Sequence, residues 1–454
     1  MKTQGEHQTT IAIIGGGVSG ALTAYHLTEQ GRDARVVVID PRADLGLGLA
    51  YSTPSLRHLL NVPAGKISAL PTEPDHFLNW LRAHYDAEAT EKTFAPRAVF
   101  GHYVQSLVAA AHGIEHVQAA AVDYRPAGDR AVVVLDDGCE LMVDRVVLAT
   151  GNFDPAPLRG VDAKAIASGA YRHNAWRAET YAGLDPDAEV TVIGTGLTAV
   201  DVVLRLRELG HRGTITAASR HGVFPNRHAE YVPLAQSAIS LETAPTCVAY
   251  LRALRKAIRE GADWRAAIDS LRASTNDLWL ALPLGEQQRF RRLLQRRWDV
   301  VRHRMAPPIA AVIQGELAAG TLRIREGHLE SVEVAAGGAT VTIRRGAGME
   351  SFAAARVINC TGPSMNYRRV NSPLLESLFA QGLVSAGPMG GGFDCTREGA
   401  LIGADGEVTE VLFNLGPGRL GTLLESIAIP EIREQAVELA EMLVNEKVCA
   451  GAAA

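Results

Sequence analysis

Cysteine is scarce in this sequence, and no two cysteines stand close together. The 454 residues hold five of them, at Cys139, Cys247, Cys360, Cys395 and Cys449. None forms the CxxC or CxxxxC pair that a redox dithiol or a metal knuckle requires. The 14 histidines show no HxxxH-type ligand spacing in a helical context either. The pattern therefore excludes a redox-active dithiol and predicts no metal site.

Long hydrophobic runs are also missing. No window approaches 18 uninterrupted apolar residues, which excludes a transmembrane helix. The first residues, MKTQGEHQTT, are polar and lead into only four apolar residues before a run of glycines, so we expect no signal peptide. Because the few, widely spaced cysteines are typical of a reducing compartment, we expect a cytoplasmic protein with no membrane partner.

Positive charge is not in excess. The formal net charge is −5 and the isoelectric point is about 6.3, which gives no general reason to expect nucleic acid or an anionic membrane as a partner. Arginine nevertheless crowds one stretch, at Arg289, Arg291, Arg292, Arg296, Arg297, Arg302 and Arg304. We interpret this stretch as a solvated helix face; the alternative is that some of its arginines steer NADPH or an anionic substrate.

Glycine, in contrast, is abundant, with 44 residues that indicate tight turns or close approaches of the backbone to a ligand. The segment TIAIIGGGVSGALTAYHLTEQG predicts a strand over 11–14, a turn and a helix over 21–30. The turn has the GxGxxG pattern, formed by Gly15, Gly17 and Gly20. The first glycine allows the tight turn, the second lets the backbone approach a pyrophosphate, and the third lets helix and strand pack closely.

The strand that follows strengthens this interpretation. The run ARVVVID is apolar and ends in Asp40, 20 residues beyond Gly20. A carboxylate at this place accepts hydrogen bonds from both ribose hydroxyls of an adenine dinucleotide. The sequence therefore predicts a dinucleotide site near the N-terminus.

A second glycine loop repeats the plan at 188–210. The segment AEVTVIGTGLTAVDVVLRLRELG predicts a strand over 190–193, a GxGxxA turn with Gly194 and Gly196, and a helix to about Leu209. The next strand ends in Ser219 and Arg220 and carries no carboxylate. Because arginine pairs with a 2′-phosphate that a carboxylate would repel, NADPH is favoured over NADH. The alternative is that Arg220 is a solvated charge at the strand end.

Two Thr-Gly turns flank the second loop. DRVVLATGNFDP (144–155) and ARVINCTGPS (355–364) each predict a strand followed by such a turn, at Gly151 and Gly362. Turns of this kind mark where a chain leaves one dinucleotide domain and later re-enters it. One dinucleotide would be a tightly bound flavin, FAD, and the other a nicotinamide nucleotide that reduces it.

This layout resembles the two-dinucleotide-binding flavoproteins. The resemblance predicts an α/β fold with two Rossmann-like domains, in which the NAD(P) domain is inserted into the FAD domain. The FAD-binding domain would comprise residues 1–160 and 350–454. The NAD(P)-binding domain would comprise residues 180–345, with a helical insertion at about 245–316.

A closer resemblance extends over nearly the whole chain. The segments IAIIGGGVSG, GLAYST, HLLNVPAGKISA, DHFLNWL, FAPRAVFGHYV, VIGTGLTAVD and LGPGRLGTLLESIAIPEIREQA occur in this order. They resemble the flavin-dependent monooxygenase family that includes bacterial FAD-dependent urate hydroxylase and the nitrosuccinate-forming aspartate N-monooxygenase. The resemblance implies that NAD(P)H reduces FAD, that the reduced flavin captures O2 as a C4a-hydroperoxide, and that one oxygen atom passes to a small polar substrate.

Three functions stay open at this point. The chain length favours hydroxylation of urate to 5-hydroxyisourate, which belongs to purine metabolism, because the aspartate enzymes are longer. N-hydroxylation of an amino acid or amine is the alternative within the family. A non-catalytic dinucleotide-binding redox sensor is the alternative of another class. Nothing in the sequence predicts an oligomeric state.

The segment GLGLAYSTPSLRHLLNVPAGKISA, at 46–69, is the predicted wall of the flavin site. It is apolar and irregular, and it begins six residues after Asp40. We expect its backbone near Val62 to meet the flavin ring while its leucines exclude water. Asn61 and Lys66 are the candidate catalytic residues, Lys66 as a stabiliser of negative charge. The alternative is a structural loop with Lys66 in solvent.

The late segment LGPGRLGTLLESIAI is a further candidate flavin contact. Its glycines, Gly416 among them, free the backbone, and we expect a short helix near Thr422. The resemblance implies that the N-terminus of this helix points at the flavin. The Gly-Asp pair that this family resemblance leads us to expect is replaced by LGP. Arg419 either adds positive charge at this place or is a surface arginine.

The resemblance also places some residues by their position alone. Trp298, His303 and Arg304 would lie toward the substrate, and Pro225, Asn226 and His228 would lie near the mouth of the nicotinamide domain. His228 is either an acid or base of the reaction or an ordinary loop histidine.

Overall fold

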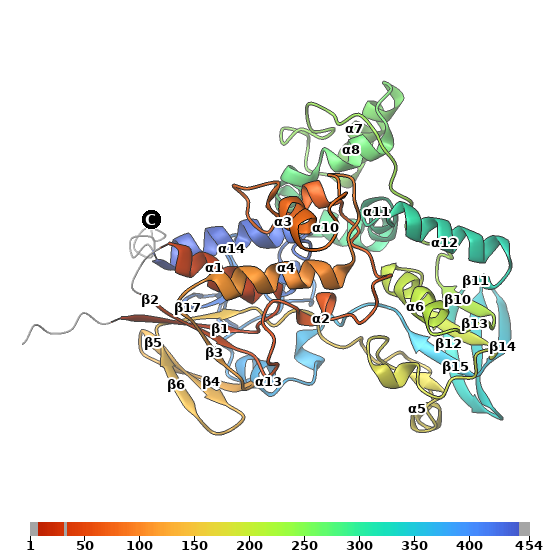
Figure 1. Cartoon of the computed structure of the whole chain (residues 1–454), viewed down its shortest axis with the longest axis horizontal. Coiled ribbons are helices and arrows are strands. Elements are labelled where there is room, and N and C mark those ends of the chain that lie inside the picture. The colour runs from red at the N-terminus through yellow and green to blue at the C-terminus, as the bar shows by residue number, and fades with distance from the viewer. Residues whose placement is uncertain (1–7, 31–33, 445–454) are drawn as a thin grey trace, which may run out of the picture. The chain divides into compact units, whose positions relative to one another are not determined.

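Residues 8–30 and 34–444 are described by the computed structural model, and they divide into two units (Figure 1). The first unit holds the described residues up to Pro54, then Val62–Asn152, then Met365 onward. The second unit holds Ser55–Asn61 and Phe153–Ser364. Most of the polar N-terminal segment and Cys449 lie outside the described residues. None of the helices in the described part is long and apolar enough to cross a membrane.

The first unit is built on a six-stranded sheet. Its central strands are buried on both faces, as parallel strands covered by helices must be, and only the edge pair is antiparallel. In spatial order the strands are β16 (Ala400–Ile402), β17 (Val408–Asn414), β7 (Arg145–Leu148), β1 (Thr9–Ile14), β2 (Ala34–Ile39) and β3 (Ile114–Val117).

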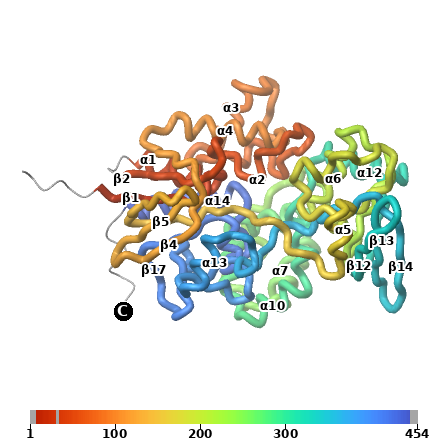
Figure 2. Tube along the Cα trace, turned by 90° about the horizontal axis from the view of Figure 1, so that it is seen from below, coloured from red at the N-terminus to blue at the C-terminus, as the bar shows by residue number. Residues whose placement is uncertain are grey.

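Helices cover this sheet, and a small antiparallel sheet lies beside it. Helices α1 (Val18–Glu29), α4 (Arg97–Ala110) and α14 (Ile429–Val444) pack side by side (Figure 1). Phe77 and Phe100 pack edge to face and join α3 (His76–His84) to α4. The remaining elements are α2 (Gly48–Tyr51), β4 (Ala121–Ala127), β5 (Arg130–Leu135), β6 (Glu140–Val143) and α13 (Pro373–Ala380), which packs on β4 (Figure 2).

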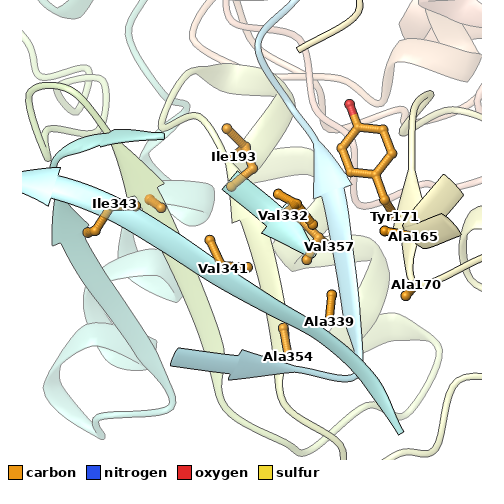
Figure 3. Close-up of a cluster of buried hydrophobic side chains, with 11 residues drawn as sticks. Ala165, Ala170, Tyr171, Ile193, Val332, Ala339, Val341, Ile343, Ala354 and Val357 are labelled. Atoms are coloured by element: carbon orange, nitrogen blue, oxygen red, sulfur yellow. The ribbon is translucent and has the colours of Figure 1, made fainter. Parts of the chain in front are cut away.

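The second unit has a five-stranded parallel sheet of its own. In spatial order it comprises β11 (Leu322–Glu326), β10 (Ile215–Ser219), β9 (Val190–Ile193), β15 (Arg356–Asn359) and β8 (Tyr171–Arg172). An antiparallel sheet of β12 (His328–Ala335), β13 (Gly338–Arg345) and β14 (Gly348–Ala354) accompanies it. Ile193 and Val357 of the parallel sheet share one buried cluster with Val341 of the antiparallel sheet (Figure 3).

The helices of the second unit fall into two groups. Helices α5 (Ala163–Ala167) and α6 (Leu197–Glu208) belong to the core of the unit, and α6 directly follows β9. The others lie between β10 and β11 and form the helical insertion: α7 (Cys247–Arg259), α8 (Trp264–Asp269), α9 (Thr275–Ala281), α10 (Leu284–Leu293), α11 (Gln295–Arg302) and α12 (Pro307–Ala318). Helix α12 begins at a Pro-Pro pair, which is tolerated in a first helical turn.

The unit boundaries differ from those expected from the sequence. Residues 153–160 and 350–364, expected in the FAD domain, belong to the second unit. The cause is strand pairing, because β15 hydrogen-bonds to β9 and to β8, and β14 pairs with β13. Gly362, which follows β15, therefore lies in the second unit and not in the first.

Candidate dinucleotide sites

The first glycine loop leaves no room for side chains at its start. Gly15 has φ of +108°, and a Cβ atom there would stand 2.4 Å from the carbonyl oxygen of Ala149. Only glycine fits such a position. The loop can therefore turn directly from β1 into α1.

The N-terminus of α1 is open to an anion. Gly17 is its N-cap, no side chain caps the helix, and the first turn carries no acidic residue. Free N–H groups and the positive end of the helix dipole favour a phosphate at such a terminus. Gly16, Gly17 and the first turn of α1 thus have the geometry of a pyrophosphate cradle.

Asp40 occupies the ribose position of this cradle. Its side chain is 3% exposed, and it accepts hydrogen bonds from the backbone N–H groups of Gly16 at 2.7 Å and Arg42 at 2.8 Å. These contacts fix the carboxylate at the carboxyl end of β2, where a dinucleotide ribose binds in this fold. The geometry fits the adenosine half of FAD.

Asn414 is a buried residue that the sequence analysis missed. It ends β17, it is 1% exposed, and neither polar atom of its side-chain amide has a hydrogen-bond partner within the described residues. An unpaired buried amide is costly, so this side chain fits a contact to a bound group. Its only sequence signal is an amide at the end of an apolar strand, just before Gly416.

Gly416 lies against α1. It has φ of +79°, and a Cβ atom there would stand 2.5 Å from Oγ of Ser19 in the first turn of α1. Its backbone N–H donates to Oε1 of Gln435 at 3.3 Å. The structure therefore brings Gly416 to the helix whose N-terminus forms the cradle. Gly151 also lies in this unit, where its carbonyl oxygen is 3.5 Å from the Tyr367 hydroxyl.

The helix predicted near Thr422 is wrong. A short 3₁₀ helix, Gly416–Gly421, ends before Thr422, and the next α-helix begins only at Ile429. Pro430 explains the late start, because proline is tolerated in a first helical turn and breaks a helix interior. The Thr422 hydroxyl instead accepts a hydrogen bond from the backbone N–H of Cys395 at 3.2 Å.

Arg419 is not a surface arginine. It is 2% exposed, and its Nη2 donates to the carbonyl oxygen of Arg397. Burial lowers the pKa of its guanidinium group, against the opposing influence of the Cys395 thiol and nearby glutamates.

The second glycine loop repeats the first in the second unit. Gly194 has φ of +122°, and a Cβ atom there would stand 2.5 Å from the carbonyl oxygen of Cys360. Gly196 is the N-cap of α6, again with no side-chain cap and no acidic residue in the first turn. Gly362 lies two residues beyond Cys360 and so follows the strand that borders this loop.

The ribose position of the second loop carries hydroxyl groups in place of a carboxylate. Ser219 ends β10, and its Oγ lies 2.9 Å from Oγ1 of Thr195, the residue between the two glycines. Arg220 follows and is exposed. The second site therefore lacks the acceptor that Asp40 supplies in the first, and its side chains suit a 2′-phosphate.

The segment 46–69 does not pack as one wall. Residues 55–61 belong to the second unit, where Nε2 of His58 lies 3.0 Å from the carbonyl oxygen of Asp201 and the ring meets Trp176 edge to face. Lys66 belongs to the first unit and is exposed. The two candidate catalytic residues, Asn61 and Lys66, are thus held by different units.

Asn61 and its neighbours have mainly backbone contacts. The Asn61 carbonyl oxygen lies 2.9 Å from Nε2 of His228, so His228 contacts the backbone of this segment. Val62 is 8% exposed and begins the return to the first unit. In that unit Gly65 donates its backbone N–H to the Glu91 carbonyl oxygen at 3.0 Å.

The arginine run is only in part the solvated face that we expected, since Arg289, Arg292 and Arg297 are exposed and the other four are not. Arg302 and Arg304 are 6% and 2% exposed, and Arg291 and Arg296 are half-buried. The cause is local pairing: Nη2 of Arg304 donates to both carboxylate oxygens of Asp269, each at 2.5 Å. The helices therefore turn several of these arginines inward.

Other reactive groups do not gather in the described residues. The four cysteines described there are free, and no cluster of three or more His, Cys, Asp or Glu side chains could hold a metal ion. Trp298 packs against the apolar cluster of Ile239, Leu271 and Leu278.

Part of the first unit matches a known family model. Residues 12–153 match a model described as FAD-NAD(P)-binding. The matched stretch includes the end of β1, the first glycine loop, Asp40 and Gly151. No curated protein sequence matches the chain.

The whole chain resembles solved flavoenzyme structures. Ornithine N-hydroxylase from Kutzneria sp. 744, solved with reduced FAD, NADP+ and L-ornithine, has a TM-score of 0.65 at 14% identity, over 96% of this chain and 99% of that one. L-lysine 6-monooxygenase from Pseudomonas syringae has a TM-score of 0.62 at 16% identity, with the same coverage. Bacillithiol disulfide reductase from Staphylococcus aureus has a TM-score of 0.59 at 14% identity, over 97% and 100%. At these identities the likeness establishes a shared α/β fold and no more.

Proposed function

We propose that the chain is a monooxygenase that binds FAD in its first unit and NADPH in its second, and hydroxylates the amino group of a small amino acid or amine. One observation carries this proposal. The chain holds two complete glycine loops, and their ribose positions differ: a buried carboxylate, Asp40, in the first and a Ser-Arg pair in the second.

In this proposal each unit binds one of the two dinucleotides. The first loop and α1 would hold the FAD pyrophosphate, Asp40 would accept the ribose hydroxyls, and Asn414 would offer its unpaired amide. The second loop and α6 would hold NADPH, with Ser219 and Arg220 at the 2′-phosphate. When bound, FAD accepts a hydride from NADPH, and in its reduced form it activates O2.

The substrate class follows from the similar structures. Two of those named above act on the side-chain amine of an amino acid, ornithine or lysine, which supports N-hydroxylation better than urate hydroxylation. The reaction balances as R–NH2 + O2 + NADPH + H+ → R–NHOH + NADP+ + H2O. NADPH supplies two electrons and the amine supplies two, and one oxygen atom leaves as water.

Asn61 and Lys66 stay in this proposal as candidate catalytic residues, and Val62 stays as a candidate flavin contact. Lys66 has the exposed ammonium group that could stabilise negative charge on reduction, and Asn61 offers an amide. Because Asn61 and Lys66 belong to different units, each can be tested by a separate substitution. A change at Lys66 should lower the yield of hydroxylated product per NADPH oxidised more than it lowers the affinity for FAD.

A dithiol reductase has less support, although one similar structure is a disulfide reductase. Within the described residues the cysteines are unpaired and distant in sequence, and only Cys139 is exposed. Burial raises the pKa of the Cys360 thiol, which keeps it protonated and unreactive.

The test is substrate-dependent NADPH oxidation by the FAD-loaded protein under 18O2. L-ornithine, L-lysine, L-aspartate, a simple diamine and urate are supplied one at a time. An N-hydroxylated product with one 18O atom supports the proposal, whereas labelled 5-hydroxyisourate from urate replaces it with the alternative. NADPH oxidation that yields only hydrogen peroxide with every compound contradicts both.

A further inference from the structure

An arginine of the helical insertion contacts the second glycine loop. Arg296 of α11 lies 101 positions from Thr195 in sequence, and its Nη2 donates to the Thr195 carbonyl oxygen at 3.1 Å and to Oγ1 at 3.0 Å. The same Nη2 donates to the carbonyl oxygen of Val223, shortly after β10. The guanidinium group therefore joins the two chain segments that border the ribose of a dinucleotide bound to this loop.

The electrostatics at this place favour an anion. Burial lowers the pKa of Arg296, the charge of Arg220 lowers it further, and Asp299 opposes both. The guanidinium groups of Arg296 and Arg220 therefore repel each other. They do so beside the N-terminus of α6, whose first turn has no acidic residue. A phosphate group placed there would relieve the repulsion between them and meet the helix dipole.

The first loop of the same chain provides the contrast. There the middle residue, Gly16, donates its N–H to the carboxylate of Asp40. In the second loop the middle residue, Thr195, shares its hydroxyl with Ser219 and accepts from Arg296. One loop offers an acceptor to ribose hydroxyls, and the other offers hydroxyl and guanidinium donors.

We propose that Arg296 is a specificity-determining residue that binds the 2′-phosphate of NADPH together with Ser219 and Arg220. Its hydrogen bonds to Thr195 and Val223 use Nη2 alone, so Nε and Nη1 remain for phosphate oxygens. The inference rests on the proposed use of a nicotinamide nucleotide in the second unit. It adds a residue from the helical insertion, which lies outside the glycine-loop motif.

The test compares NADP+ with NAD+, which differ only in the 2′-phosphate. Binding to the FAD-loaded protein is measured by calorimetry, without turnover. We expect Arg296→Gln to weaken NADP+ at least tenfold and NAD+ less than twofold, since it removes a charge-assisted contact to the phosphate. Arg296→Lys, which keeps the charge, should retain part of the preference. Arg297→Gln is the matched control, because Arg297 is the exposed neighbour in the same helix.

The ratio of the two dissociation constants decides the outcome. The ratio is measured within one preparation, so partial unfolding of a variant cancels. If Arg296→Gln weakens NAD+ as much as NADP+, or changes neither, Arg296 does not bind the 2′-phosphate and the inference is overturned. The measurement is independent of substrate oxidation, so failure of the monooxygenase proposal would leave its result standing.

Discussion

At the scale of single residues, the two ribose positions carry the most information. Asp40 and Ser219 stand at the ends of equivalent strands, and each is joined to the middle residue of its glycine loop. The first supplies negative charge and the second does not. In the proposed function, this difference at the strand end separates a site for free ribose hydroxyls from a site for a phosphorylated ribose.

The first residue-scale prediction concerns Asp40. Asp40→Asn removes the charge and one of the two acceptors that hold the backbone N–H groups of Gly16 and Arg42. Hydrogen bonds to a charged group contribute about 1.5–3 kcal/mol, so we expect the dissociation constant of FAD to rise roughly 10- to 100-fold. Fluorescence titration of the apoprotein measures it. Asp44→Asn, at an exposed position of the same loop, should leave FAD affinity unchanged, and equal effects of the two changes would contradict the role of Asp40.

The second residue-scale prediction concerns His26. Burial lowers its pKa to about 4, and its Nε2 has no hydrogen-bond partner among the described residues. The folded-state pKa is below the unfolded value of about 6.5, so the folded state resists protonation. Its contribution to stability is complete above pH 6.5 and is lost as the pH falls from 6.5 toward 4.

We expect the free energy of unfolding to fall by about 2 kcal/mol between pH 7.5 and pH 5 through this group. In His26→Leu that part of the pH dependence should disappear from urea titrations of the first unit. His112→Leu, at an exposed histidine, should keep it. An unchanged slope in His26→Leu would show that His26 does not titrate as a buried neutral group.

At the scale of elements, the sequence predicts what depends on local pattern. Both glycine loops follow from strand, turn and helix signals within about 25 residues. The sequence offers the arginine run as a possible anion contact but does not single out Arg296, because its contact with Thr195 joins positions 101 apart. The helix expected at Thr422 is wrong because Pro430, not the apolar pattern, decides where α14 begins. The path of Ser55–Asn61 into the second unit also follows from tertiary packing, which the sequence pattern does not show.

The element-scale prediction concerns the ion pair that joins Asp269, the last residue of α8, to Arg304 in the segment after α11. Arg304 is buried against Asp269, which also accepts a hydrogen bond from the Tyr231 hydroxyl. Burial would raise the pKa of the Asp269 carboxyl, but Arg304 and Tyr231 reverse this and keep it below its usual value. Asp269→Asn leaves a buried, uncompensated guanidinium group, and we expect a loss of about 3–5 kcal/mol in the free energy of unfolding.

The control for this prediction is an ion pair in the same unit that is open to solvent. The side chains of Arg212 and Asp187 are 67% and 66% exposed. Asp187→Asn should lower the free energy of unfolding far less in the same urea titration, because an ion pair open to solvent contributes little. Similar losses in the two variants would mean that burial does not set the strength of the Arg304 pair.

At the scale of the whole molecule, each unit carries its own dinucleotide loop, so the two ligands should protect different peptides. In hydrogen exchange with mass spectrometry, FAD should slow exchange in 15–20 and 38–42, and NADP+ should slow exchange in 194–199 and 219–223. Bound ligands stabilise the state that they bind and reduce local opening. Protection of 15–20 by NADP+ in the FAD-loaded protein would contradict this assignment of the sites.

The way the chain is threaded has a consequence for its synthesis. Strands β7 and β17 are neighbours in the first sheet, yet Leu148 and Val408 are 260 residues apart in sequence. As the chain leaves the ribosome, β1, β2, β3 and β7 emerge first. The edge of β7 that pairs with β17 stays without this partner while residues 153–364 are translated. The nascent protein therefore presents an unpaired strand edge, which is prone to aggregation. The first unit is completed last, when β17, Gly416 and α14 have emerged, so FAD binding at the site proposed in this unit is expected to be a late, post-translational step.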